Sequence, residues 1–582
     1  MRSKGTRSVR DAIAGALLAS ILAAPTAAEP STMEEKNADP QAQLETRARE
    51  LLQHYDAAIR PLEIELSLAW WRANTTGKDE DFAAKEAAQN RLDLALSDAG
   101  RFADLKAIRE RARAEPGALS KLAARGIEIL YLQALEKQVD PDLLRKLSAL
   151  SNSVEKAFNV YRARVDGREL ADSEVRRALK ESKDSAYRKA VWEGSKGVGS
   201  LVEAQLRELV KLRNESARKL GFEDYHAMQL GLAEQSRDEV LRIFDELEAL
   251  SREPFRKVKA EIDARIAREL KIGVADLRPW HYHDPFFQEA PAVYDVDLDA
   301  AYRDQDLLDL ARRFYQGIGL PVDDILARSD LYERQGKNPH AFCTDIDRAG
   351  DVRVLANVVP NEYWMGTLLH ELGHGVYSSK NIPAELPYVL RTEAHTLATE
   401  AIAMLFEKFS KRAGWLRALG VEVPDPAAFD ATGRKLERDR LLIFAAWSQV
   451  MFRFEAAMYQ DPDRDLSKLW WDLVERYQEV RRPEGRNAPD YAAKIHVVTA
   501  PAYYHNYLLG ELFASQLHRK IARDVLGQDP RTAIYNGRPE VGAFLKERVF
   551  APGRSLAWGE LVRHATGEDL NPKAFAEAIA VP

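Results

Sequence analysis

The stretch Trp364-Met365-Gly366-Thr367-Leu368-Leu369-His370-Glu371-Leu372-Gly373-His374-Gly375-Val376-Tyr377 decides the fold of this 582-residue chain. Its first six residues are mostly apolar and helical in pattern, so we expect the stretch to form a buried helix. Residues four apart lie on one helical face, so His370 and His374 can offer imidazole nitrogens to a single metal ion. Glu371 borders that face and can reach a water molecule held by the metal.

The His-Glu-x-x-His pattern is typical of zinc peptidases, in which the metal keeps a third protein ligand and one position for water. The alternative is a pair of core histidines, because twelve histidines in such a chain produce the pattern by chance in roughly one chain in fifty. Three downstream acids, Glu385, Glu393 and Glu400, are candidates for the third ligand. Spacing alone does not choose between Glu393 and Glu400, and the other acid could orient a histidine or lie on the surface.

Helices are predicted on both sides of this motif. From about residue 34 to residue 270, apolar residues recur three and four apart between charges, and helices resume after Tyr363. Between them, Ala341–Ile346 and Val352–Val359 flank a glycine-containing turn and predict a β-hairpin. We therefore expect a mostly α fold with one small β-sheet. The clearest helical segments are Leu119–Leu135, Asp172–Glu193, Leu201–Leu220, 390–412, 431–460 and 503–526.

The segment Arg278–Asp299 interrupts the helical pattern. It is dense in aromatic and polar residues, from Pro279 to Phe287, and is predicted to be a structured loop. Such a loop either links two halves of the protein or lines a cleft.

The first 28 residues have the three-part pattern of a secretory signal peptide. Basic residues up to Arg10 precede an apolar run from Ala12 to Ala24, and small residues follow it. The run is too short to cross a bilayer comfortably, and the alternative is an uncleaved anchoring segment. We expect residues 1–28 to be removed, residues 29–582 to form one catalytic domain, and the protein to be periplasmic or secreted.

Composition excludes several classes of site and partner. The formal charge of −7 gives no reason to expect nucleic acid or an anionic membrane as a partner. Cys343 is the single cysteine, which excludes an intramolecular disulfide and a cysteine-rich metal site. No stretch beyond the amino terminus approaches 18 consecutive apolar residues, so we expect no membrane association of the mature form.

With Thr399-Glu400-Ala401-Ile402-Ala403, the motif resembles the angiotensin-converting-enzyme family of zinc peptidyl-dipeptidases, which are gluzincins, and more distantly the thimet-type oligopeptidases. In these families the third zinc ligand is a glutamate on a following helix, at about the separation of Glu400, which lies 26 residues after His374. The resemblance is strong from about residue 338 to residue 515. It implies a zinc ion held by His370, His374 and Glu400, in a large two-lobed helical metallopeptidase with a deep central cleft for short peptides.

Two further blocks match these families. His340-Ala341 lies 30 residues before His370, where the family has an edge strand that binds the substrate backbone. A later block contains Lys494-Ile495-His496 and Tyr504-His505-Asn506-Tyr507. The resemblance implies that Glu371 acts as base and then acid, that His496 and Tyr507 assist at the scissile carbonyl, and that Lys494 and Tyr504 hold the C-terminal carboxylate.

The implied activity is zinc-dependent hydrolysis of short peptides with release of C-terminal dipeptides. An alternative is an endo-acting oligopeptidase with no strict requirement for a free C-terminal carboxylate. An alternative of another class is an inactive peptide-binding homologue. The oligomeric state is not predicted.

The sequence departs from the family at four places. The gap from His496 to Tyr507 is one residue longer than in angiotensin-converting enzyme, so Tyr503 competes with Tyr504. Asn506 replaces an arginine that binds an activating chloride, so a chloride requirement is not predicted. Met404 replaces an aspartate one turn after the third ligand. A glutamine that helps to hold the substrate carboxylate has no clear match, and the nearest residues are His281 and Tyr282, beside Trp280.

Overall fold

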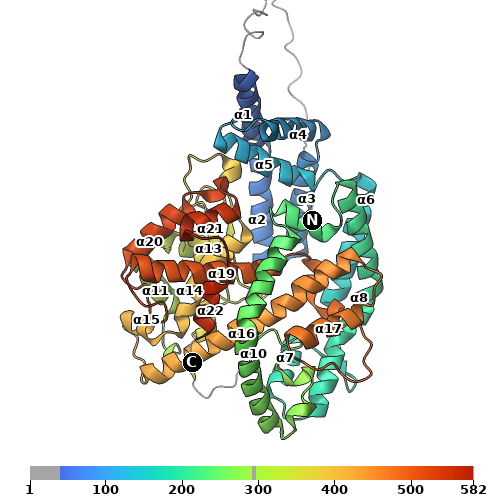
Figure 1. Ribbon diagram of the computed structural model, residues 1–582, viewed down its shortest axis with the longest axis vertical. Coiled ribbons are helices and arrows are strands. Elements are labelled where there is room, and N and C mark those ends of the chain that lie inside the picture. Colours follow the sequence, from blue (N-terminus) through green and yellow to red (C-terminus); the bar gives the residue numbers. More distant parts are fainter. Residues whose placement is uncertain (1–39, 292–296, 581–582) are drawn as a thin grey trace, which may run out of the picture.

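A computed structural model describes residues 40–291 and 297–580, and the predicted signal peptide lies outside this part. The described chain is mostly helical, which confirms the mostly α fold (Figure 1). The helices are α1 (Pro40–Ala58), α2 (Arg60–Thr76), α3 (Asp79–Leu96), α4 (Ala99–Ala114), α5 (Lys121–Leu135), α6 (Pro141–Val160), α7 (Asp172–Glu181), α8 (Ser185–Lys219), α9 (Tyr225–Leu232), α10 (Arg237–Leu270), α11 (Leu307–Gly317), α12 (Asp323–Arg328), α13 (Glu362–Val376), α14 (Thr396–Glu407), α15 (Ala413–Ala418), α16 (Pro426–Gln460), α17 (Leu466–Tyr477), α18 (Ile495–Thr499), α19 (His505–Lys520), α20 (Pro539–Leu545), α21 (Trp558–Thr566) and α22 (Lys573–Ile579).

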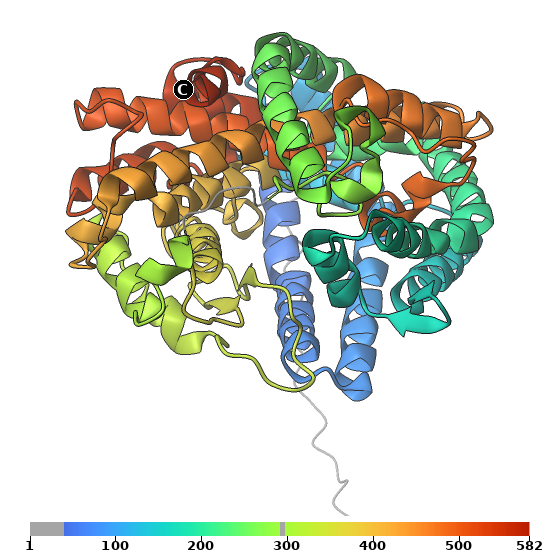
Figure 2. The ribbon, with the colours of Figure 1, turned by 90° about the horizontal axis from the view of Figure 1, so that it is seen from below.

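The first five helices have an apolar cluster of their own. Residues of α1, α3, α4 and α5 pack together with the short 3-10 segment η5 (Tyr388–Leu390). Gly77, with a φ of +67°, ends α2 in the left-handed conformation that suits glycine at a helix terminus. In Figure 2, α2 and α3 (blue) run side by side between the half that contains α13 and the half that contains α8.

The rest of the described chain shares one continuous core. Figure 1 shows α13, α14 and α19 in one half, α6, α8 and α17 in the other, and α16 running from one half to the other. Among the described residues, α16 is the one helix long and apolar enough to cross a membrane, but 83% of its most apolar window is buried inside the protein. The core helix of a soluble protein has the same properties, so this helix is weak support for a membrane span.

The predicted hairpin is present as β3 (Phe342–Asp345) and β4 (Val352–Leu355), an antiparallel pair with Phe342 opposite Leu355. Asp330 pairs with the other side of β4, because its N–H donates to the Val354 carbonyl at 2.9 Å. No described strand pairs with the outer edge of β3, which is the kind of edge to which an extended peptide can add.

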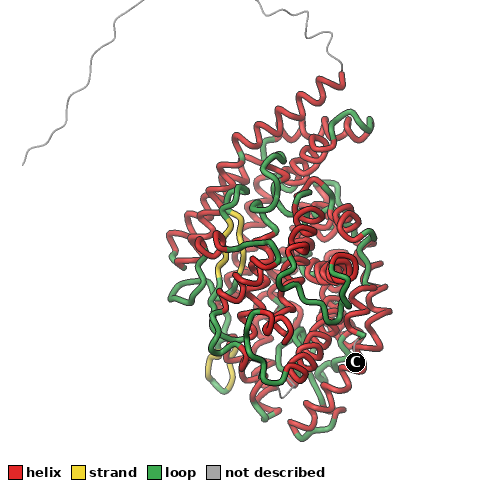
Figure 3. The backbone as a smooth tube through the Cα atoms, turned by 90° about the vertical axis from the view of Figure 1, so that its left-hand side faces the viewer, coloured by secondary structure: helices red, strands yellow, loops and turns green. Residues whose placement is uncertain are grey.

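The structure contains a second hairpin that the helical interpretation of residues 34–270 did not predict. Strands β1 (Ala163–Val165) and β2 (Arg168–Leu170) pair across Asp166-Gly167, both of which have positive φ (Figure 3). An Asp-Gly pair at a two-residue turn is the sequence signal for such a hairpin. The strands are only three residues long, which hid the alternation between the long helices around them.

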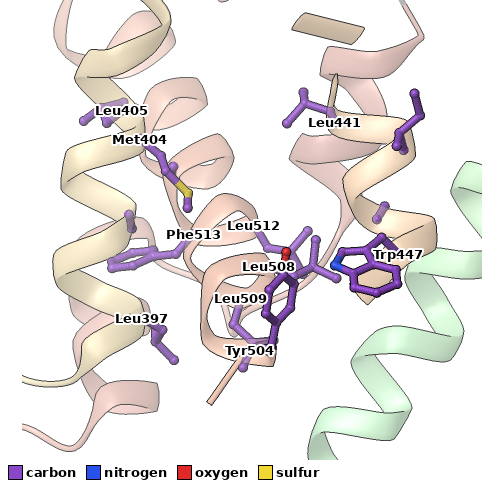
Figure 4. Packing of buried hydrophobic residues seen from close by; sticks show 14 of the residues in the cluster. Leu397, Met404, Leu405, Leu441, Trp447, Tyr504, Leu508, Leu509, Leu512 and Phe513 are labelled. Atoms are coloured by element: carbon purple, nitrogen blue, oxygen red, sulfur yellow. The ribbon is translucent and has the colours of Figure 1, made fainter. Parts of the chain in front are cut away.

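Helices α13, α14 and α19 are in close contact because two glycines leave room for it. A Cβ atom on Gly373 of α13 would lie 2.7 Å from the Cα of Ala403 in α14. A Cβ on Gly510 of α19 would lie 2.9 Å from the Cβ of Glu400. Apolar side chains fill the space around these contacts, and Figure 4 shows Phe513 of α19 beside α14 and Leu508 on the side toward Trp447 of α16.

Candidate metal centre

Three predicted ligands converge between α13 and α14. One ligand atom from each of His370, His374 and Glu400 lies within 4.8 Å of the other two. The two imidazole Nε2 atoms are 3.2 Å apart, and Glu400 Oε2 lies 3.7 Å from that of His370 and 4.0 Å from that of His374. Tetrahedral zinc with bonds near 2.1 Å requires ligand atoms about 3.3 Å apart, so the three groups surround a space of the right size.

The outer nitrogens of both histidines are occupied. His370 Nδ1 lies 3.1 Å from Glu407 Oε2, and His374 Nδ1 lies 2.7 Å from Thr399 Oγ1. These contacts orient each ring with Nε2 toward the shared space, which is the usual arrangement around metal-binding histidines. Met404 stands where the family has an aspartate, and Glu407 lies about one turn after it. Glu407 therefore supplies a carboxylate in place of that aspartate.

The charges at this centre call for a cation. Glu400 Oε2 is buried and has no hydrogen-bond partner in the described protein. Burial lowers the pKa of His370, but its hydrogen bond to Glu407 and the nearby carboxylates outweigh this and raise the pKa to about 9. Two imidazole nitrogens with one carboxylate form a donor set that fits zinc.

Glu371 lies on the same turn of α13 and is 7% exposed. Burial raises the pKa of Glu371 to about 7, with Glu400 and Glu407 adding to the rise. His370 and a hydrogen bond from the backbone of Cys343 in β3 act in the opposite direction. A carboxyl group tuned in this way can take up and release a proton near neutral pH.

The tyrosine and histidine block lies next to the three ligands. Glu400 is close enough to Tyr507 to raise its pKa, after burial and the neighbouring Tyr503, so the phenol keeps its proton. Tyr503 shares a hydrogen bond with Tyr507, and the His496 ring lies 6.3 Å from the Tyr507 ring. Burial, and then Lys494, lower the pKa of His496 to about 3, so its ring is neutral. Its buried Nδ1 has no hydrogen-bond partner among the described residues.

Lys494 lies on the far side of this block. It is 6% exposed, and its Nζ is 5.4 Å from the centre of the Tyr504 ring. The centre of the Tyr504 ring lies 5.4 Å from that of Tyr507, and the Tyr503 ring also contacts Tyr507. Of the two competing tyrosines, Tyr504 is the one beside Lys494. Burial lowers the pKa of Lys494 to about 8.

Sequence reasoning missed Gln288. Its Oε1 accepts a hydrogen bond from Lys494 Nζ, so an amide stands beside the lysine. His281 and Tyr282, the residues considered for this place, make other contacts, with Ser185 and with Asp263 and Lys259. The signal was Phe286-Phe287-Gln288 in the predicted loop, whose aromatic content was compatible with a linker or a cleft-lining role and did not show which polar residue reaches the lysine.

The remaining candidate residues lie outside the cluster of three metal ligands. His340 is exposed and Ala341 half-buried, and both come just before β3. Of the acids that spacing left open, Glu385 is exposed, while Glu393 accepts a hydrogen bond from Thr392 and is outside the ligand cluster. Asn506 is buried and accepts a hydrogen bond from Gln235 at 3.0 Å, so the position of the family's chloride-binding arginine is neutral.

Comparisons with known proteins identify the family of the chain. The sequence model of the family described as angiotensin-converting enzyme matches residues 42–577. An angiotensin-converting enzyme of Theromyzon tessulatum is 21% identical over 430 residues, which are 68% of this chain and 69% of that protein. Carboxypeptidase 1 of Bacillus subtilis (strain 168) is 22% identical over 308 residues, 49% of this chain and 58% of that enzyme.

Proposed function

The chain belongs to the angiotensin-converting enzyme family of metallopeptidases, and on this premise we propose that it uses zinc to release dipeptides from the C-terminus of short peptides. The observation that carries the proposal is the convergence of His370, His374 and Glu400, with the buried Glu400 Oε2 lacking any partner in the described protein. A bound zinc ion would supply Lewis acidity and lower the pKa of water near neutrality.

Proton transfer is assigned to Glu371. Its carboxylate accepts a proton as water attacks the peptide carbonyl, and then gives the proton to the leaving amine. Burial and the backbone hydrogen bond from Cys343 fix the position of this carboxylate beside the ligands. Since Cys343 belongs to β3, a peptide aligned along the edge of β3, near His340 and Ala341, would pass the base.

Tyr507 and His496 act on the carbonyl oxygen as charge develops. Tyr507 keeps its proton because its pKa is raised by burial, so it can donate a hydrogen bond to the oxyanion. Neutral His496 has one ring N–H and can donate a second hydrogen bond. Both rings are in place without substrate, which reduces the reorganisation required in the transition state.

Lys494, Tyr504 and Gln288 form the group that would hold the substrate carboxylate. Lys494 is within 5.4 Å of the Tyr504 ring, and Tyr504 is 5.4 Å from Tyr507. Tyr504 thus contacts both Lys494 and Tyr507, so a carboxylate held beside Lys494 would lie a short stretch of peptide from a carbonyl beside Tyr507. This arrangement supports cleavage near a free C-terminus.

Two experiments test the proposal. Elemental analysis should find one zinc per chain, and Glu371→Gln should abolish turnover while keeping that zinc. A pair of identical peptides, one with a free carboxylate and one with a C-terminal amide, should be digested at very different rates when the products are read by mass spectrometry. Equal rates would favour the endo-acting oligopeptidase instead, and a protein without zinc, or an active Glu371→Gln variant, would remove the enzyme mechanism.

Export is a separate proposal that rests on residues 1–28 alone. Removal of this segment would leave a periplasmic or secreted peptidase. Amino-terminal sequencing of protein recovered from outside the cytoplasm should begin near residue 29. Recovery of the protein in the cytoplasm with its amino terminus intact would reject the export proposal.

A further inference from the structure

A cavity lies along α19, and none of the three predicted metal ligands lines it. It has a volume of about 610 Å³ and is bounded by the segment that follows α14, part of α16, α19 with the segment after it, and α22. Figure 1 shows these helices together in the half of the protein that contains the carboxyl end. Volumes of several hundred Å³ are typical of sites for small molecules.

Basic side chains dominate this cavity although the whole chain is acidic. Seven arginine or lysine side chains line it, against four carboxylates, while the chain has a net charge of −7. His518 also lines it but adds no charge, because its ring is held between the Pro530 carbonyl and the Tyr535 hydroxyl and burial lowers its pKa.

Each of the four carboxylates of the cavity already forms an ion pair with at least one arginine. Glu437 and Glu511 both accept hydrogen bonds from Arg440, at 2.9 Å and 3.2 Å. Glu577 pairs with both Arg519 and Arg523. Asp529 pairs with Arg531 through contacts at 2.8–3.2 Å. The four acids therefore leave other cations of the cavity without a partner.

Three of the lining cations, Lys408, Arg412 and Arg434, make no ion pair with any carboxylate in the described ranges. Arg412 reaches one acceptor, the Arg531 carbonyl, at 3.4 Å. Lys411, next along the chain, differs because it pairs with Glu362 at 2.9 Å. Glu437, Glu511 and Asp430 are near enough to influence Lys408 or Arg412 electrostatically, but within the described ranges they form no ion pair with these two cations.

These unpaired cations repel one another in a partly buried space. Burial, followed by the charge of Arg412, lowers the pKa of Lys408 to about 7. Burial also lowers the pKa of Arg412, and Arg434 adds to the decrease, while Glu437 and Asp430 act in the opposite direction. Grouping like charges away from water is costly unless an anion offsets them. Guanidinium groups are suited to bind phosphate oxygens in pairs.

We infer that the cavity is a binding site for a small multivalent phosphate compound, held by Lys408, Arg412 and Arg434. The ligand is of the diphosphate class, because one phosphate group would fill only part of the space and three separate cations line it. The site is distinct from the metal centre, since none of His370, His374 and Glu400 lines it. Arg440, bound by Glu437 and Glu511 of the cavity, also acts electrostatically on Glu407, the partner of His370.

The test is isothermal titration of the full chain with inorganic pyrophosphate, beside sodium chloride of equal ionic strength. We expect saturable binding of one pyrophosphate per chain and none of chloride. Lys408→Met and Arg434→Gln should each weaken binding by about ten-fold or more, because each removes a charged hydrogen-bond donor. Lys106→Met, the same change on the exposed face of α4, should leave binding unchanged.

Pyrophosphate can also coordinate metals, so Glu400→Gln is the second control. This variant removes a metal ligand and should bind pyrophosphate as the parent does. Binding that is lost in Glu400→Gln but kept in Lys408→Met would place the anion at the metal and overturn the inference. The absence of saturable binding to the parent protein would also overturn it. The midpoint of thermal unfolding of the parent protein, compared with and without pyrophosphate, tests binding without any variant, because a ligand that binds the folded state raises it.

Discussion

Replacing Gly373 by alanine tests whether the contact between α13 and α14 sets the metal site. The new Cβ would lie 2.7 Å from the Cα of Ala403 and 3.1 Å from the carbonyl oxygen of Ile402. Ordinary contact begins at 3.4 Å, so the helices must separate by about 0.7 Å. Both close neighbours are backbone atoms, so a side-chain rotation cannot relieve the clash. Because Glu400 belongs to α14, the third ligand must move with the helix.

The expected effects follow from these distances. Overpacking of this kind costs about 1–3 kcal/mol, and replacing a helical glycine by alanine returns about 1 kcal/mol, so the net loss of stability should be about 0–2 kcal/mol. Zinc affinity should fall further, by roughly 10- to 100-fold, because metal–ligand distances tolerate only about 0.2 Å. Competition with a fluorescent chelator measures the affinity, and thermal unfolding of the metal-free protein measures the stability.

Gly559→Ala is the matched control. Gly559 is a helical glycine in α21, and a Cβ there would meet nothing within 4 Å. This variant should be as stable as the parent or more so, with unchanged zinc affinity. If Gly373→Ala bound zinc as tightly as the parent, the reasoning that close helix packing positions the ligands would be refuted.

Three other outcomes are expected. Glu407→Gln should lower zinc affinity by about 10- to 100-fold, because His370 loses its carboxylate partner, and unchanged affinity in a chelator titration would contradict this role. Tyr507→Phe should lower kcat by roughly 100-fold with zinc content and KM kept, and a loss confined to KM would point to substrate binding instead. Lys494 has its pKa lowered to about 8 and is charged below that value, so kcat/KM for peptides with a free carboxylate should fall as pH rises through about 8. The same pH series with amide-capped peptides should show no such fall, and a parallel fall in both would exclude Lys494 as its cause.

The local pattern of the sequence was enough to predict the helix with His370 and His374 and the hairpin before it. Both depend on neighbours a few residues apart, and β3 and β4 begin within one residue of the predicted runs. The predicted helix Asp172–Glu193 is two helices, α7 and α8, separated at Ser182-Lys183-Asp184. Asp184 caps α8 by accepting from the N–H groups of Ala186 and Tyr187, a helix start that the apolar period does not reveal.

Contacts between distant segments could not be predicted from spacing. The choice of Glu400 over Glu393 needed the resemblance, since both acids were compatible with the local pattern, and the structure brings Glu400 to the histidines because Gly373 and Gly510 let three helices meet. Glu407 and Gln288 were missed for the same reason. Their partners, His370 and Lys494, are 37 and 206 residues away along the chain.

The order of the site along the chain has a consequence for how the protein matures. The three ligands come from two consecutive helices within 31 residues, whereas Tyr507 arrives on α19, 107 residues after Glu400. Contacts between nearby segments close sooner during folding than contacts between remote ones. We therefore expect the histidines and Glu400 to approach one another before Tyr507 reaches them. Since Gly510 of the same α19 packs against Glu400, the arrival of that helix would complete the cation site and deliver Tyr507 to it in one event.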